Sequence, residues 1–298
     1  MKNSVAIRIS RPSAATRVIL ITALLASLGC CGQGQKAATD APEAVATSGE
    51  IPKDLTLDLG GGVKMETMLI PAGAFTMGSG KGPFENEKPA HRVAISRPFY
   101  LGEYPVTQEQ WQAIMGTDPS RFKGAKRPVE GVSWKDAQEF CRAVSAKVGK
   151  TVRLPTEAEW EFACRAGSAT DYCFGDSEAA LAKYAWYEGN SSGATHPVGQ
   201  KKSNAWGLYD MHGNVWEWCR DWYDPKYYAN SPHVDPQGPA RSNLGAHVLR
   251  AGAWHVEASY CRSAGRGGDF PCGEGGPGSW NDAGRSGLRI VVCASETP

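Results

Sequence analysis

The hydrophobic pattern of the chain begins at Leu55 and continues to Val292, which predicts one folded domain over residues 55–296. Three segments within it place apolar residues on one helical face, and each follows a serine or threonine that can cap a helix. Each segment also ends at a glycine, the residue that most readily adopts the left-handed conformation beyond a helix. From cap to glycine, the predicted helices cover residues 107–116, 133–149 and 156–167.

Short apolar runs bounded by turn residues predict β-strands. These runs are residues 68–70, 75–77, 92–95, 99–101, 248–250 and 288–292. Between about 165 and 285 the pattern indicates mostly loop, and the 35 Gly and 19 Pro of the chain agree with many turns. The sequence therefore predicts a loop-rich α+β domain. Such a domain needs support beyond hydrophobic burial, from bound metal, disulfides or clusters of its 10 Trp residues.

The N-terminus has the pattern of a secretion signal, which we place at residues 1–29. A basic start precedes an apolar run, residues 18–28, that is too short to cross a bilayer. The run leads into Cys30 and Cys31 in a context that resembles a bacterial lipobox, in which the cysteine carries the lipid. We expect lipidation at Cys30, with Cys31 as the other candidate. An ordinary cleaved signal, in which the cysteines have no role, is the alternative.

Residues 30–54 are rich in Ala, Thr, Gly and Gln without apolar periodicity, and they predict a flexible tether. Together with a lipid anchor, this predicts a protein secreted across the inner membrane that is periplasmic or membrane-anchored. The chain has 32 basic and 31 acidic residues, a balance that offers no electrostatic basis for binding nucleic acid. It also lacks His-Glu-x-x-His and Cys-x-x-Cys motifs, which argues against several common enzyme classes.

Six segments together resemble a known family. They are residues 68–78, 87–93, 104–111, 127–137, 153–161 (RLPTEAEWE) and 204–218 (NAWGLYDMHGNVWEW). In this order they are similar to the sulfatase-modifying factor family, that of the formylglycine-generating enzymes, over residues 65–292. The resemblance implies a compact domain poor in regular secondary structure and related to the C-type lectin fold.

The resemblance also implies a copper site, and the chain departs from it. Members of the best-known type oxidise a sulfatase cysteine to formylglycine with oxygen, using Cu(I) held by two cysteine thiolates. In the matching stretch, residues 250–261, the second thiolate is Cys261, whereas Val256 occupies the first position and Ala253 replaces a serine. Because valine has no lone pair, these positions do not form the two-thiolate site. Copper is therefore doubtful, and Cys261 is the one remaining catalytic candidate.

A different metal site would use the neighbours of Val256. His255 and Glu257 alternate with it and would share one face of a strand, near Cys261. Such a site would suit Fe(II), Zn or Cu(II) better than Cu(I). Cys272 follows in a Gly-rich stretch, but nothing sets its distance from Cys261. The alternative is an exposed His and Glu on a loop, with Cys261 a small buried hydrophobic residue.

The resemblance places Cys141 and Cys164 at disulfide positions of some secreted relatives. In those relatives the partner cysteines lie at positions that hold Arg266 and Ile290 in this chain. The sequence therefore leaves two alternatives, a Cys141–Cys293 bridge and free buried thiols.

The resemblance further implies a calcium site in the segment 210–217. Its ligands would be a side-chain oxygen of Asp210, the carbonyls of Gly213 and Val215, and the carboxylate of Glu217. A hard cation prefers such oxygens. The alternative is that Asp210 and Glu217 pair with nearby Arg residues or accept backbone N–H groups.

Two functions from different classes follow. The first is an oxygen-dependent oxidoreductase of the formylglycine-generating type, with an altered copper site and a protein or peptide substrate at the cell envelope. The second is a catalytically silent, lectin-like domain that binds a peptide or protein partner there.

Overall fold

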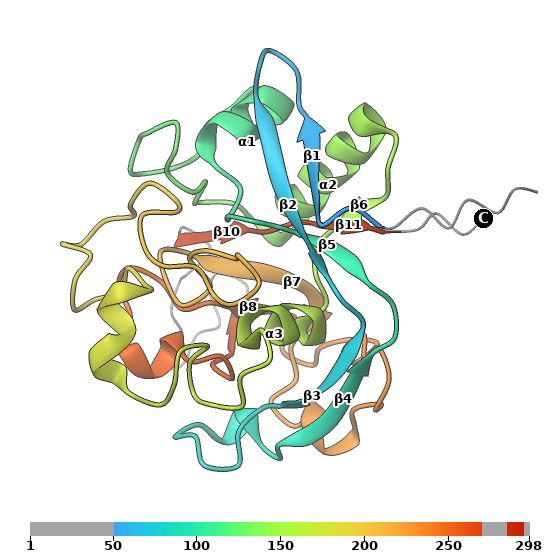
Figure 1. Cartoon of the computed structure of the whole chain (residues 1–298), viewed down its shortest axis with the longest axis vertical. Coiled ribbons are helices and arrows are strands. Elements are labelled where there is room, and N and C mark those ends of the chain that lie inside the picture. The colour runs from blue at the N-terminus through green and yellow to red at the C-terminus, as the bar shows by residue number, and fades with distance from the viewer. Residues whose placement is uncertain (1–50, 270–284, 295–298) are drawn as a thin grey trace, which may run out of the picture. The chain divides into compact units, whose positions relative to one another are not determined.

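The computed structural model describes residues 51–269 and 285–294, and these residues form both helices and short strands (Figure 1). The expected loop-rich α+β fold is confirmed. The expected signal segment, Cys30, Cys31 and Cys272 lie outside the described residues. At the start of the described part, the Pro52 carbonyl accepts a hydrogen bond from the Tyr100 hydroxyl. Pro52, which precedes the expected start of the domain at residue 55, thus already contacts a strand of the domain.

Three α-helices begin at the expected caps. They are α1 (Gln108–Met115), α2 (Trp134–Val148) and α3 (Glu157–Arg165). Thr107 and Thr156 each form a capping box, with Gln110 and Glu159 respectively, and the Ser133 side chain accepts from a backbone N–H of α2. These local hydrogen bonds explain why the sequence alone locates the helix starts. At the end of α3, Ala166 is the C-cap in the left-handed conformation, with φ 45°, and Gly167 follows with a φ of 89°.

The larger sheet is antiparallel and has the order β1–β2–β5–β11–β6. Its strands are β1 (Asp54–Asp58), β2 (Lys64–Ile70), β5 (Phe99–Gly102), β11 (Val291–Cys293) and β6 (Val152–Arg153). A separate hairpin joins β3 (Gly73–Met77) and β4 (His91–Ile95). The sequence located β3, β4 and β5, but it missed β1 and β6.

A second sheet occupies the part of the chain that the sequence indicated as mostly loop. Its order is β10–β7–β8–β9, with β10 parallel to β7 and the other pairs antiparallel. The strands are β7 (Trp216–Trp222), β8 (His247–Arg250), β9 (Gly267–Asp269) and β10 (Ser286–Leu288). The prediction of loop was therefore wrong for β7 and β9. Charged residues that are buried within β7, Glu217 and Asp221, conceal its apolar pattern.

The predicted strand 288–292 is two strands in two different sheets. β10 ends at Leu288, and β11 begins at Val291 in the larger sheet. Arg289, between them, is fully buried and pairs with Glu217 of β7. The chain thus passes from one sheet to the other at a buried ion pair.

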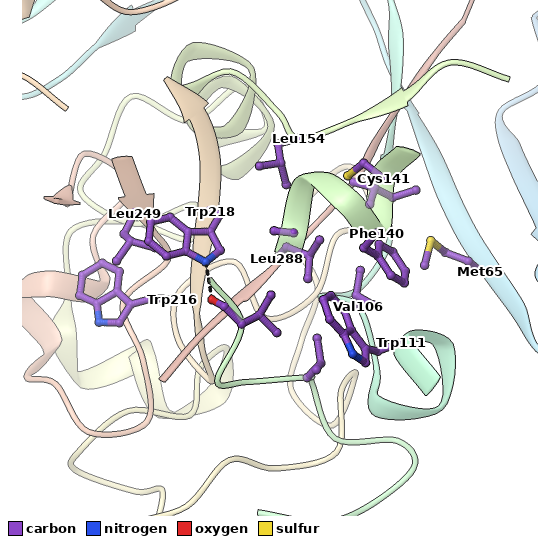
Figure 2. Close-up of a cluster of buried hydrophobic side chains, with 14 of the residues drawn as sticks. Met65, Val106, Trp111, Phe140, Cys141, Leu154, Trp216, Trp218, Leu249 and Leu288 are labelled. Carbon is purple, nitrogen blue, oxygen red and sulfur yellow. Dashed lines mark hydrogen bonds between the residues drawn. The ribbon is translucent and has the colours of Figure 1, made fainter. Parts of the chain in front are cut away.

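One apolar cluster packs α1 and α2 against strands of both sheets (Figure 2). In it, Trp111 and Phe140 stack with ring centroids 5.2 Å apart. The Trp218 indole N–H donates to the Val132 carbonyl at 2.8 Å, so this large side chain is buried without an unpaired polar atom.

α3 adds buried charge to the interior. Glu157 receives two hydrogen bonds from Arg266, at 2.7 and 2.8 Å. Glu161 receives hydrogen bonds from Arg165, at 2.8 Å, and from Arg250. Both carboxylates belong to the motif 153–161, so that part of the resemblance reflects ion pairs that connect α3 to β8 and to the segment before β9.

The cysteines described by the structure are free thiols. Cys141, on α2, lies in the apolar cluster with Val292 and Ala294 of the β11 region. Successive side chains of a strand point to opposite faces, so Cys293 faces away from Cys141. It lines a cavity of about 390 Å³ together with Arg153. A Cys141–Cys293 bridge is therefore not formed, and of the two possibilities the structure has the free thiols.

Among the described residues, none of the helices has the length and apolar character needed to cross a membrane.

Candidate functional site

The candidate site follows β8. The chain leaves this strand through Ala251 and Gly252, which both have positive φ values, 85° and 71°. It then forms a short 3-10 helix, η4 (Ala258–Cys261). A Cβ added to Gly252 would lie 2.7 Å from the Cys261 Sγ. Gly252 is therefore required twice, for its backbone conformation and for the close approach of the Cys261 side chain.

Cys261 is fully buried, and the two altered positions are buried with it. Ala253 and Val256 belong to the same apolar cluster as Cys261. Burial raises the pKa of the Cys261 thiol far above its ordinary value. A neutral thiol beside a valine offers Cu(I) neither a thiolate nor a second sulfur, so the residues at these positions do not fit the copper site of the family.

Two side chains contact backbone carbonyls of η4. The Tyr172 hydroxyl donates to the Ala258 carbonyl at 3.0 Å. His212 Nδ1 lies 2.8 Å from the Cys261 carbonyl, and its Nε2 lies 3.2 Å from the backbone N–H of Cys173. Because the carbonyl only accepts and the N–H only donates, His212 is neutral with its proton on Nδ1. The sequence did not single out His212 or Tyr172, although His212 lies within the motif 204–218.

The alternative metal ligands do not come together. Glu257 is exposed, and His255 is half-buried against the Trp254 ring, with centroids 4.8 Å apart. Within residues 51–269 and 285–294, no three His, Cys, Asp or Glu side chains form a group that could hold a metal ion. Cys261 is a small buried residue, as the alternative interpretation of the sequence had it.

The segment of the expected calcium site is buried and well packed. Glu217 accepts hydrogen bonds from the Trp160 indole N–H at 2.7 Å and from Arg289 at 2.9 Å. The Gly213 carbonyl accepts from the Val215 N–H at 3.0 Å. Glu217 thus has an arginine partner, which is the pairing that the sequence left open as the alternative.

The surroundings of the Asp210 carboxylate differ from those of Glu217. Asp210 is almost fully buried, and its carboxylate accepts the Gly199 N–H at 2.8 Å and a long contact from the Asn214 amide at 3.5 Å. Burial is the main cause that raises its pKa to about 6, and the negative charge of Glu217 adds to it. The charge of one buried carboxylate thus acts on the other, and Arg289 forms its ion pair with Glu217. The segment supplies negative charge and oxygen atoms, which are what a hard cation such as calcium needs as ligands.

Comparison with known proteins places this fold and its motifs in a family. The pattern of the sulfatase-modifying factor enzyme 1-like domain matches residues 62–288. The chain belongs to this family. The resemblance found in the sequence is thereby confirmed.

Relatives in the family have different names. A formylglycine-generating enzyme of Streptomyces coelicolor is 34% identical over 260 residues, which cover 64% of this chain and 79% of the relative. Chaperone protein LppX of Paenibacillus barcinonensis is 31% identical over 242 residues and covers the same shares. Among solved structures, Treponema denticola variable protein 1 is 33% identical with a TM-score of 0.72, over 82% of this chain and all of that protein.

Proposed function

We propose that this chain is a protein- or peptide-binding member of its family that does not perform copper-dependent formylglycine formation. The observation that carries the proposal is the state of Cys261. Its side chain is buried, and burial raises the pKa of the thiol. The other position of the family's copper pair is taken by Val256, which is also buried. Oxygen activation by Cu(I) needs both thiolates, so a single protonated thiol leaves the family's reaction without its metal.

The relatives support a binding role within this fold. One similar protein is named a formylglycine-generating enzyme and another a chaperone, at nearly equal identity to this chain. The same scaffold therefore occurs in proteins named for chemistry and in proteins named for assisting another protein. The alternative, an oxidoreductase with an altered copper site, would need a ligand set that the described residues do not assemble.

The proposed setting is the cell envelope. A lipid on Cys30 would hold the N-terminus at a membrane, and residues 31–50 would connect it to the folded domain. The partner would then be a peptide or protein at the same surface.

We also propose a structural calcium ion in the segment 210–217. Asp210, Glu217 and the carbonyls of Gly213 and Val215 would hold it, and it would compensate the buried charge of Asp210. Its role would be to stabilise the loop before β7, with no part in chemistry.

The test of the proposed function measures copper, oxygen and peptide binding in the same preparation. The protein is reconstituted with Cu(I), its copper content is determined, and oxygen uptake is followed with a cysteine-containing sulfatase peptide. The Streptomyces relative provides the positive control. Fluorescence polarisation compares the peptide with its Cys→Ser form.

We expect substoichiometric copper, no peptide-dependent oxygen uptake, and equal affinity for the two peptides if this peptide is a ligand. Tight one-to-one copper binding with rapid oxygen uptake would overturn the proposal.

A further inference from the structure

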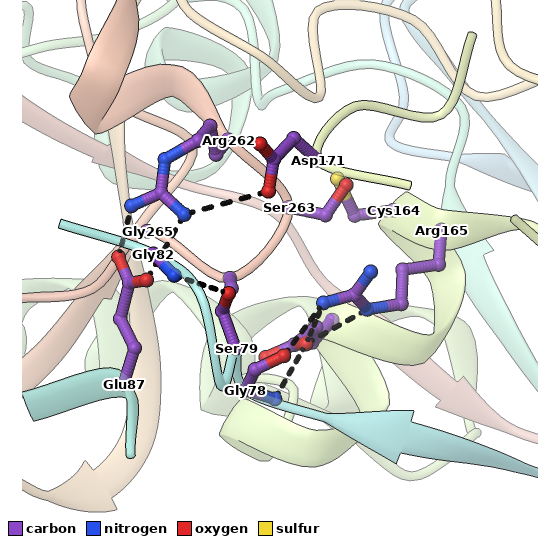
Figure 3. Close-up of polar contacts among 12 residues, drawn as sticks. Gly78, Ser79, Gly82, Glu87, Cys164, Arg165, Asp171, Arg262, Ser263 and Gly265 are labelled. Atoms are coloured by element: carbon purple, nitrogen blue, oxygen red, sulfur yellow. Dashed lines mark hydrogen bonds and ion pairs between the residues drawn. The ribbon is translucent and has the colours of Figure 1, made fainter. Parts of the chain in front are cut away.

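The loop between β3 and β4, residues 78–90, contacts the chain next to η4 through the Glu87–Arg262 pair (Figure 3). Its base is fixed to α3, since the Gly78 N–H donates to Glu161 at 2.9 Å and Arg165 donates to the Gly78 carbonyl at 3.0 Å. The Ser79 N–H also donates to the Glu87 carbonyl at 3.0 Å, which closes the loop on itself. Hydrogen bonds therefore fix the start of the loop to α3, and residues 81–90 form its tip.

The tip holds residues on both sides of Cys261. Arg262 forms two hydrogen bonds with the buried Glu87 carboxylate, one of them at 3.0 Å. The Phe84 ring stacks on the Tyr260 ring with centroids 4.7 Å apart. Farther along, Arg266 donates to the Asn86 carbonyl at 2.7 Å. Tyr260 and Arg262, the two neighbours of Cys261, are thus both held by the same loop.

These contacts contain little apolar burial. Between residues 81 and 90, Gly82 and Glu87 are the buried positions, and Phe84 is half-buried. The tip is held by the Glu87–Arg262 charge pair, by the Phe84 stack and by hydrogen bonds of Asn86. The Gly82 position leaves room for the charge pair, because an added Cβ would lie 2.2 Å from a Glu87 carboxylate oxygen. Segments with few buried apolar contacts open locally at lower free energy than the core. Removing one member of a buried ion pair leaves the other charge uncompensated.

We propose that the β3–β4 loop is a clasp on η4, and that its release by loss of the Glu87–Arg262 pair exposes the Cys261 thiol to solvent. The thiol packs against Gly252 from the side of η4. With the clasp closed, the loop holds η4 through Tyr260 and Arg262, and hydrogen bonds from Tyr172 and His212 hold its backbone carbonyls. With the clasp open, the contacts of Tyr260 and Arg262 with the loop are lost, and η4 can lift from Gly252. This inference is independent of the proposed binding function.

The test follows the alkylation of each cysteine separately. The full chain is reduced and treated with iodoacetamide under native conditions, and the labelled peptides are quantified by mass spectrometry over time. Glu87→Gln removes the buried charge of the clasp. Glu85→Gln is the matched control, because it makes the same change in the same loop at an exposed residue that pairs with Lys88. Cys141 and Cys219, buried elsewhere, report on unfolding of the whole domain.

We expect Glu87→Gln to accelerate labelling of Cys261 by about tenfold or more, since losing charge-assisted hydrogen bonds shifts a local opening equilibrium by at least this factor. Labelling of Cys141 and Cys219 should stay at the wild-type rate, and Glu85→Gln should change none of the three. An unchanged rate at Cys261 would overturn the proposal. Equal acceleration at all three cysteines would overturn it as well, because the pair would then support the whole domain.

A second variant keeps the test decisive if Glu87→Gln does not fold. Phe84→Ala removes the stack on Tyr260 and leaves the buried charges in place. We expect it to accelerate labelling of Cys261 to a smaller extent, again without change at Cys141. An unchanged Cys261 rate in a folded Phe84→Ala protein would count against the clasp.

Discussion

Arg289 and Glu217 form an ion pair in the interior of the protein. The Arg289 Nη2 lies 2.9 Å from the Glu217 Oε1, and both side chains have no exposed surface. Arg289 also donates to the carbonyls of Gly102, Glu103 and Tyr209. This one guanidinium therefore connects β7 to the ends of segments that lie far apart in the sequence.

Breaking this pair should lower the free energy of unfolding more than breaking an exposed ion pair does. Glu217→Gln leaves the Arg289 charge buried and unpaired, so we expect the free energy of unfolding to fall by about 3–5 kcal/mol. Glu139→Gln, which breaks the exposed pair with Arg142, should change it by less than about 1 kcal/mol. Urea denaturation in the presence of EDTA measures both variants without any contribution from calcium. Similar losses for the two would contradict the structural importance of the Arg289 pair.

Restoring the missing sulfur should restore copper binding. Val256→Cys places two cysteines at the family's ligand positions, and Ala253→Ser adds the hydroxyl that the resemblance assigns to the oxygen site. We expect the double variant to bind Cu(I) more tightly by more than the roughly 10- to 100-fold that an outer-shell partner contributes. Competition with a Cu(I) chelator measures the affinity. Val256→Ala is the control for the altered packing, and an equal gain in that variant would exclude the added sulfur as the cause.

Calcium should raise the melting temperature. A ligand that binds only the folded state stabilises it by RT ln(1 + [L]/Kd), which is about 2.7 kcal/mol at a hundred times Kd. Thermal unfolding with excess calcium is compared with unfolding in EDTA, and Asp210→Ala should abolish the difference. Equal melting temperatures of the unmodified protein in the two conditions would count against the site.

The pH dependence of stability should carry a contribution from Asp221. Burial, followed by the nearby Glu157 carboxylate, raises the pKa of Asp221 from 3.8 to about 8. Because the folded protein holds this proton more tightly than the unfolded chain does, the contribution is complete below about pH 4. It is lost as the pH rises through about 8.

Asp221→Asn keeps an acceptor for the Glu157 N–H, which lies 3.0 Å from the wild-type carboxylate, and removes the titration. We expect the free energy of unfolding of the wild type, relative to this variant, to fall steadily between about pH 4 and pH 8. Chemical denaturation at a series of pH values gives this difference. A difference that rises with pH would show that Asp221 is ionised in the folded protein.

Lipidation should occur at Cys30. In a bacterial host with lipoprotein processing, intact-mass analysis is expected to show a lipid-bearing N-terminus at this residue, and the protein should partition into detergent. Cys30→Ser should abolish both results, whereas Cys31→Ser should change neither. An unmodified N-terminus beyond residue 31 would exclude the anchor.

The sequence was most informative where structure depends on near neighbours. Thr107 and Thr156 accept hydrogen bonds from N–H groups three residues ahead, so the helix starts could be located without knowledge of the fold. The absence of a two-thiolate site was equally plain, because Val256 has no lone pair in any conformation. The long motifs also identified the family correctly, although they do not predict which residues their side chains contact.

Those contacts were decided by tertiary structure. β7 could not be recognised from its pattern, because Glu217 and Asp221 are acidic residues that are buried and hydrogen-bonded to groups distant in sequence. Similarly, spacing alone left Cys141–Cys293 open as a disulfide, whereas the alternation of side chains along β11 places the two thiols on opposite faces of a sheet. The ring nitrogens of His212 likewise found their partners in two separate loops.

The sequence by itself thus determined the helix starts and the family, since these follow from residue type and short-range hydrogen bonding. Only the tertiary structure decided that Cys261 is a buried neutral thiol and that Glu87 and Arg262 connect the β3–β4 loop to the chain next to η4. The physical reason is that burial and the pairing of charges depend on which distant segments exclude water together, and local sequence does not contain that information.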